Sequence, residues 1–195
     1  MTTIAIAAAA LDTANAADPK KHADGRPDAL HYADAITRWI PRLVSTPSPA
    51  LTLAARAQHL ERWVIARTSY PDGKAAYFQW RKAVQARQGD RARELLADLV
   101  TPEIIDRVAT LISKKAPVGD PEAQALEDAA CLVFLEQEIA AFAAQHRDYT
   151  AEQYIIILRK TWKKMSPAAH TFALGLHLDE PFAGLVKAAL SLPLS

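Results

Sequence analysis

Residues 119–146, GDPEAQALEDAACLVFLEQEIAAFAAQH, give the clearest indication of the fold class. Asp120 followed by Pro121 is typical of a helix start, because aspartate caps the first turn and proline fits the first helical position. Residues 129–135 are then apolar without interruption, so every face of a helix is apolar for nearly two turns. Such a segment packs against neighbours on all sides. The stretch therefore predicts a helix at the centre of an all-α fold.

The chain on either side of this stretch has the same helical character. Apolar residues recur at spacings of three and four, and the alternation of a strand is nowhere sustained. An opening helix is predicted before Asp18, and Thr150 with Gln153 has the spacing of a capping box at a later helix start. We predict one multi-helix globular domain over residues 1–195. A further helix beginning at residue 28 would carry its apolar face on Leu30, Ala33, Ile36, Ile40 and Leu43.

Composition limits the partners and the compartment. Lys and Arg number 23 against 22 Asp and Glu, so any site for an anion must be local rather than a property of the whole surface. No run approaches the ~18 consecutive apolar residues of a membrane span. The single cysteine, Cys131, excludes an internal disulfide and favours a reducing compartment. We expect a cytoplasmic protein without membrane contact, and the sequence leaves its oligomeric state open.

A second informative stretch is AARAQHLERWVIART, residues 54–68, whose small, apolar and arginine positions predict a buried helix. It carries His59, which could be a packed core residue, a metal ligand or an acid–base group. Arg62 lies one helical turn away. A neighbouring cation lowers the pKa of an imidazole and keeps it neutral, which is the form that binds metal or accepts a proton.

Cationic and aromatic side chains gather around and after His59. Guanidinium groups bind phosphate or carboxylate with two hydrogen bonds, and aromatic rings stack on nucleic-acid bases. The opposite interpretation is that the aromatics belong to the core and the arginines pair with nearby acids. We predict a concave anion site lined by His59, Arg62 and at least one of Arg67 or Arg81, with Tyr70 beside it. Its ligand would be an anionic small molecule or a nucleotide, with RNA as the alternative partner. The whole cluster comprises Arg62, Trp63, Arg67, Tyr70, Tyr77, Trp80, Arg81 and Lys82.

Two carboxylates, Glu127 and Asp128, come directly before the apolar run. A carboxylate beside a buried segment must be paired, hydrogen-bonded or metal-bound, because burying it alone is costly. A salt bridge to an arginine is one interpretation, and a functional site is the other.

The order of His31, His59 and Asp128 on three predicted helices resembles the HD-domain superfamily of helical metal-dependent phosphohydrolases. In that superfamily a histidine is followed by a His-Asp doublet and, later, by an aspartate in a buried helix, which the segment LEDAACLVFL resembles. The resemblance implies an HD-like helical bundle in which His31, His59 and Asp128 hold a divalent metal. Arg62 and Arg67 would orient the substrate and Glu127 would act as base. Leu60 stands where the aspartate of the doublet would be, so that carboxylate is missing from the ligand set.

A closer resemblance covers nearly the whole chain. The segments ARAQHLERWVIARTSYP, YFQWRKA, QALEDAACLVFLE and LRKTWKKMS resemble the family called domain of unknown function 4202. Two functions therefore stay open. One is metal-dependent hydrolysis of a phosphorylated small molecule or nucleotide. The other is a non-catalytic helical module that binds RNA or a nucleotide through its arginines and aromatics.

Overall fold

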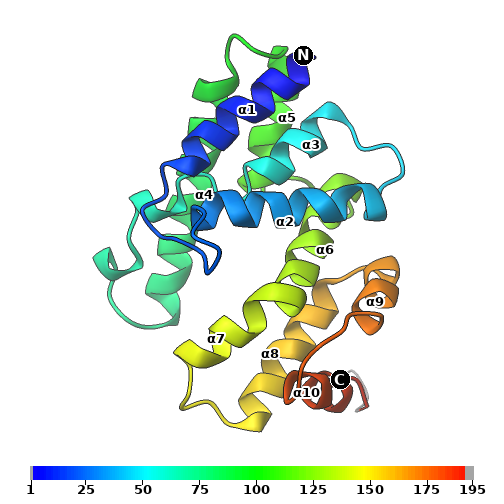
Figure 1. Ribbon diagram of the computed structural model, residues 1–195. Helices are drawn as coiled ribbons and strands as arrows, with labels where there is room; N and C mark the ends of the chain where they lie inside the picture. Colours follow the sequence, from blue (N-terminus) through cyan, green and yellow to red (C-terminus); the bar gives the residue numbers. More distant parts are fainter. Residues whose placement is uncertain (1, 192–195) are drawn as a thin grey trace. The chain divides into compact units, whose positions relative to one another are not determined.

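The computed structural model describes residues 2–191, and every regular element in this range is a helix (Figure 1). The all-α prediction is confirmed. Contacts divide the chain into two compact units, Met1–Leu126 and Glu127–Ser195, which are described separately below. That residues 1–195 form one domain stays a prediction. Within residues 2–191, no helix is both long and apolar enough to cross a bilayer.

The first unit is built from five complete helices and the start of a sixth. Helix α1 contacts α2, α3 and α4, while α5 packs against α3 and α4. Leucine and isoleucine side chains with almost no exposed surface fill the space between these helices, among them Leu11, Ile36, Leu53 and Leu111. Their burial supplies the main driving force for the fold. The helices are α1 (Thr3–Ala16), α2 (Asp28–Leu43), α3 (Pro49–Arg56), α4 (Lys74–Leu96), α5 (Pro102–Ile112) and α6 (Pro121–Val133).

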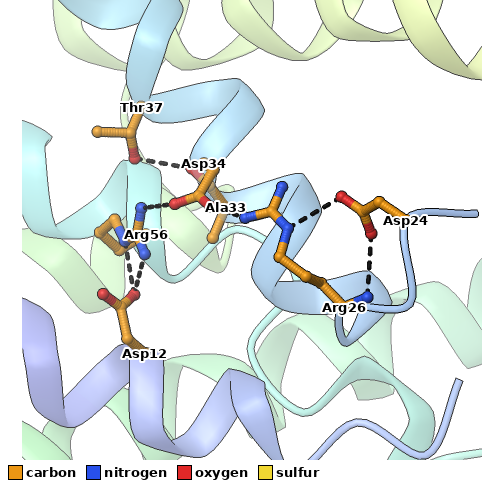
Figure 2. A network of polar contacts seen from close by, with 7 residues as sticks. All are labelled: Asp12, Asp24, Arg26, Ala33, Asp34, Thr37 and Arg56. Atoms are coloured by element: carbon orange, nitrogen blue, oxygen red, sulfur yellow. Dashed lines mark hydrogen bonds and ion pairs between the residues drawn. The ribbon is translucent and has the colours of Figure 1, made fainter. Parts of the chain in front are cut away.

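Arg56, the last residue of α3, joins α3 to α1 and α2 (Figure 2). Its guanidinium lies between two carboxylates. It donates hydrogen bonds to Asp12 of α1 and to Asp34 of α2, the latter at a distance of 2.5 Å. Asp34 also accepts from Arg26 at 2.7 Å. Only 12% of the Arg56 side chain is exposed, against 34% for Asp12 and 32% for Asp34, so the guanidinium is the most desolvated of these three groups. Removing one member would leave its partners uncompensated.

Helix α3 ends at Arg56, so the prediction of one helix over residues 54–68 is wrong. The side chain of Asn15 in α1 donates to the Arg56 carbonyl oxygen at 2.9 Å. In a continuing α-helix that oxygen would accept from the N–H of Leu60. The Leu60 N–H instead bonds to Ala57 at 3.2 Å. A bond from another helix thus replaces the one that would have extended α3.

Helix α4 fixes the turn that follows. Gln88 donates to the carbonyl oxygen of Gln58 at 3.3 Å. Glu61 adopts a left-handed backbone conformation, φ 47°, and its carboxylate pairs with Arg87 at 2.8 Å and Arg91 at 3.0 Å. Tertiary contacts therefore override local helical propensity here. Two short 3₁₀ helices lead on toward α4, η1 (Arg62–Val64) and η2 (Arg67–Ser69).

The start of α6 has the predicted form. A carboxylate oxygen of Asp120 accepts hydrogen bonds from the backbone N–H groups of Glu122 and Ala123, as an N-cap does. Asp120 also pairs with Arg107 at 2.7 Å. Hydrogen bonds from Arg107 and from the helix backbone lower the pKa of Asp120 to about 2. Both local capping and an ion pair with α5 set this helix start.

The second unit begins within α6 and continues through a π-helical segment. The apolar run predicted to be buried is buried at Ala129, Cys131, Leu132, Val133 and Leu135. Helix α8 packs against α10. Thr150 and Gln153 form the predicted capping box of α8. The elements are η3 (Phe134–Glu138), α7 (Ile139–Gln145), α8 (Ala151–Lys164), α9 (Pro167–Leu174) and α10 (Phe182–Ser191).

Candidate anion-binding cleft

A cleft of about 250 Å³ opens in the first unit. Its lining comes from three parts of the chain: the loop before α2 with the first residues of α2, the turn and 3₁₀ segments after α3, and one residue of α4. The polar and aromatic side chains on which its chemistry depends are Lys20, Asp28, His59, Arg62, Arg67 and Trp80.

His59 lies in the turn after α3, with its ring stacked on Tyr32 of α2. The two ring centroids are 3.7 Å apart and the ring planes differ by 10°. Its Nε2 atom is 3.4 Å from a terminal nitrogen of Arg62. Because a guanidinium has only donors, Nε2 can bond to it only without a proton. Burial lowers the pKa of His59 well below its usual range, and the charge of Arg62 lowers it further. Both effects favour the neutral imidazole, the form expected from the sequence.

Trp80 holds Arg62 from another side. The indole N–H donates to the carbonyl oxygen of Ile65 at 2.8 Å, which fixes the ring against the segment after η1. The Arg62 guanidinium carbon lies 4.8 Å from the centroid of the Trp80 ring, within the range of a cation–π interaction. Arg62 is therefore held by His59 and Trp80 in the wall of the cleft.

Arg67 is anchored differently. One terminal nitrogen donates to the carbonyl oxygens of Tyr70 at 2.9 Å and Pro71 at 3.0 Å, so both of its hydrogens are used. Within residues 2–191 Arg67 makes no further hydrogen bond and no ion pair. Its Nε and its second terminal nitrogen, which carry three hydrogens between them, are thus left to bind an anion.

Two carboxylates also line the cleft, and both have partners. Asp18 is buried and accepts hydrogen bonds from the backbone N–H groups of Lys20 and Ala29, each at 2.9 Å. It thereby satisfies an N–H at the start of α2. Asp28 pairs with the Lys20 ammonium at 2.8 Å. Three cations against two engaged carboxylates leave the lining with an excess of positive charge.

His59, Arg62 and Arg67, the predicted wall of the anion site, line one cleft, and that this cleft binds an anion stays a prediction. Tyr70 contributes its backbone carbonyl, which holds Arg67. Arg81 is not part of the lining. Its charge adds to burial and to Arg62 in lowering the pKa of His59.

The predicted metal ligands each contact other side chains. His31 stacks on His22, with ring centroids 3.5 Å apart, and burial lowers its pKa. His59 was predicted to lie on a helix, but it lies in the turn after α3, where its ring stacks on Tyr32. In the part of the chain that the structure describes, no three His, Cys, Asp or Glu side chains are grouped so that they could hold a metal ion. A divalent metal on His31, His59 and Asp128 stays a prediction.

The two carboxylates before the apolar run are in the second unit. Asp128 is buried, and its oxygens accept from the backbone N–H of Ser166 at 2.8 Å and from the Ser166 hydroxyl at 2.6 Å. The prediction that a carboxylate here must be paired or hydrogen-bonded is confirmed. Glu127 lies 3.3 Å from the ammonium of Lys164, a lysine rather than the expected arginine. Its role as a base stays a prediction.

Three charged residues of the cleft were missed from the sequence: Asp18, Lys20 and Asp28. They lie in DPKKHADGRPD, residues 18–28, a charged loop with proline and glycine between two predicted helices. Such a loop is typical of a functional connection held on a rigid scaffold. Nothing in its residue types indicates that it meets the turn after α3, because that meeting depends on how α1, α2 and α3 pack.

Comparison with known families gives one match. Residues 5–186 match the family described as domain of unknown function (DUF4202). The chain belongs to this family. The DUF4202 match includes every residue of the cleft and both carboxylates of the second unit. Neither the curated proteins nor the solved structures contain a match to this DUF4202 chain. Its more distant resemblance to HD-domain enzymes stays a prediction.

Proposed function

We propose that the cleft binds the phosphate or carboxylate group of a small anionic ligand. The observation that carries the proposal is Arg67, a cation in the lining that has no carboxylate partner within residues 2–191 and retains three free hydrogens. A guanidinium presents its hydrogens in a planar fork that matches two oxygens of a phosphate or carboxylate.

Arg62 supports the same function because it is already ordered. A flexible arginine loses side-chain entropy when it binds a ligand, at a cost of about 0.5–1.5 kcal/mol. Here His59 and Trp80 hold the guanidinium before any ligand arrives. The neutral His59 does this without adding a charge that would repel Arg62.

Lys20 supplies a third cation through a pair that can be exchanged. Its ammonium bonds to Asp28, but the lysine side chain is mostly exposed. An exposed ion pair contributes only about 0–1 kcal/mol. The lysine can therefore move from the carboxylate of Asp28 to an incoming anion at little cost.

The test is a titration of the whole protein with inorganic phosphate, followed by backbone NMR signals. Signals of residues 59–67 should shift, and the affinity should fall as salt is added. Arg62→Met and Arg67→Met should each weaken binding about tenfold or more, the loss expected for one charge-assisted hydrogen bond. Arg93→Met is the matched control, because Arg93 is an arginine of α4 that pairs with Asp106 outside the cleft. Unchanged signals in the cleft, or equal affinity of all four proteins, would refute the proposal.

A further inference from the structure

Two aromatic rings lie exposed next to the cleft. Tyr77 and Phe78, in the first turns of α4, have 38% and 53% of their surface accessible. The Tyr77 ring centroid is 5.8 Å from that of Trp80, which lines the cleft, and 5.7 Å from that of Phe78. The three rings thus form a row that runs from the cleft lining to the surface of the first unit.

Trp80 is the buried end of this row, whereas Tyr77 and Phe78 lie outside the core. Helix α4 begins at Lys74, and its first buried residue is Trp80. Tyr77 and Phe78 therefore stabilise the core little, although each exposes a large apolar surface. Adjacent exposed aromatics beside a binding cleft are typical of a surface that contacts a ligand.

On the basis of the function proposed above, we propose that the ligand is a mononucleotide. Its phosphate binds Arg62 and Arg67 in the cleft, and its base stacks on the face of one exposed ring, Tyr77 or Phe78, whose planes differ by 66°. Aromatic rings bind bases through their faces, and this contact tolerates any base. The ligand class follows from the juxtaposition of a phosphate-binding fork with a row of rings, which a sugar phosphate or a simple dicarboxylate would leave unused.

A single nucleotide fits the charges better than an RNA strand does. RNA binding relies on a basic groove that follows several phosphates. Here the cleft has a volume of about 250 Å³, its lining includes Asp18 and Asp28, and the whole chain carries a net charge of +1. One phosphate has matching groups in this cleft, whereas the carboxylates of Asp18 and Asp28 in the same lining disfavour a second.

The test compares three probes by calorimetry on the full chain: inorganic phosphate, ribose 5-phosphate and adenosine monophosphate. The nucleotide should bind about tenfold or more tightly than ribose 5-phosphate, because only the nucleotide has a base to stack. The double variant Tyr77→Leu with Phe78→Leu should lose this preference and keep its affinity for phosphate. The double variant Tyr77→Phe with Phe78→Tyr is the matched control and should keep the preference, because it retains both rings.

Each other outcome has a distinct meaning. Equal affinity for the nucleotide and for ribose 5-phosphate would overturn the mononucleotide proposal while leaving anion binding intact. Loss of phosphate affinity in the leucine variant, with an altered circular dichroism spectrum, would show that the rings maintain the fold, and would overturn it too. If a short single-stranded RNA binds much more tightly than the nucleotide, the mononucleotide proposal is overturned and the partner is RNA. Absence of binding by both phosphate and ribose 5-phosphate would instead refute the function proposed for the cleft.

Discussion

His59 shows how one side chain acquires its charge state from its surroundings. Burial disfavours the imidazolium, and the adjacent Arg62 disfavours it further, so the pKa of His59 lies well below its usual range. Protonation would also remove the acceptor that faces Arg62. The neutral form of His59 is therefore needed to hold Arg62 in the wall of the cleft. Acidification should lower the stability of the first unit and release Arg62 from His59.

The pKa of His59 predicts how stability depends on pH. The folded chain binds fewer protons at His59 than the unfolded chain does once the pH falls below about 6.5, the usual pKa of histidine. Stability contributed by the neutral form is present above that pH and is lost as the pH falls. The slope from this residue approaches about 1.4 kcal/mol per pH unit. Urea unfolding of wild type and His59→Gln between pH 7.5 and 5.5 measures it.

His59→Gln should lose less stability on acidification than wild type does. His31, whose pKa burial also lowers, contributes a slope of the same sign, so the comparison must be between proteins that both retain it. His177→Gln, which alters an exposed histidine, is the control and should keep the wild-type slope. Parallel pH profiles for His59→Gln and wild type would contradict this account of His59.

Asp128 is expected to matter for stability through Ser166. Replacing it by alanine removes the carboxylate that accepts the Ser166 N–H and hydroxyl at the start of α9. Hydrogen bonds to a charged group contribute about 1.5–3 kcal/mol, and we expect Asp128→Ala to lower the free energy of unfolding by that amount. Chemical denaturation measures the loss, with Asp148→Ala, an exposed aspartate, as control. Equal stability of the two variants would contradict the prediction.

Among the helices, ends that are set by nearby residues could be predicted from the sequence, whereas an end that is set by a distant residue could not. Helix starts at Asp120 and Thr150 were predictable, because their caps lie within three residues of the groups they satisfy. The end of α3 was not predictable. Its carbonyl at Arg56 is satisfied by Asn15, which is 41 residues away in the chain. The small and apolar residues after Arg56 favour a helix, and only the packing of α1 and α4 prevents it.

The turn after α3 yields a prediction about Glu61. Both Glu61→Ala and Glu61→Gly lose the ion pairs with Arg87 and Arg91. Glycine adopts the left-handed conformation without strain, whereas alanine does so at a cost of about 1–2 kcal/mol. We therefore expect the alanine variant to be less stable than the glycine variant by about that amount in urea unfolding.

A control separates the turn from its ion pairs. Glu94 is an exposed carboxylate that also pairs with Arg91, so Glu94→Ala should change stability by no more than about 0.5 kcal/mol. If the glycine variant of Glu61 proves no more stable than the alanine variant, the left-handed conformation does not set the turn.

At the scale of the molecule, the cleft and the buried carboxylate belong to different units of the chain. Every residue of the cleft lining lies in Met1–Leu126, whereas Asp128 belongs to Glu127–Ser195. The sequence grouped Arg62 and Arg67 because they are neighbours along the chain, and both line the cleft. It could not place Lys20 or Asp28, since their position depends on the packing of three helices.

Because the cleft and Asp128 belong to different units, we predict that Asp128 does not affect anion binding in the cleft. Asp128→Ala should leave the affinity for phosphate unchanged, because Asp128 acts through Ser166 and makes no part of the cleft lining. Calorimetry on the variant, together with the metal content of protein purified without a histidine tag, tests this. A joint loss of bound metal and of phosphate affinity would instead support a metal held by His31, His59 and Asp128.

The ion network at Arg56 also bears on how the chain folds as it is synthesised. Asp12 and Asp34 precede Arg56 in the chain, so both carboxylates leave the ribosome before the guanidinium that neutralises them. N-terminal segments fold first during synthesis, and buried charges without partners are unstable. The first two helices should therefore stay loosely associated until α3 emerges. Stalled nascent chains of increasing length should become resistant to protease only once Arg56 has cleared the exit tunnel, and Arg56→Met should abolish that step.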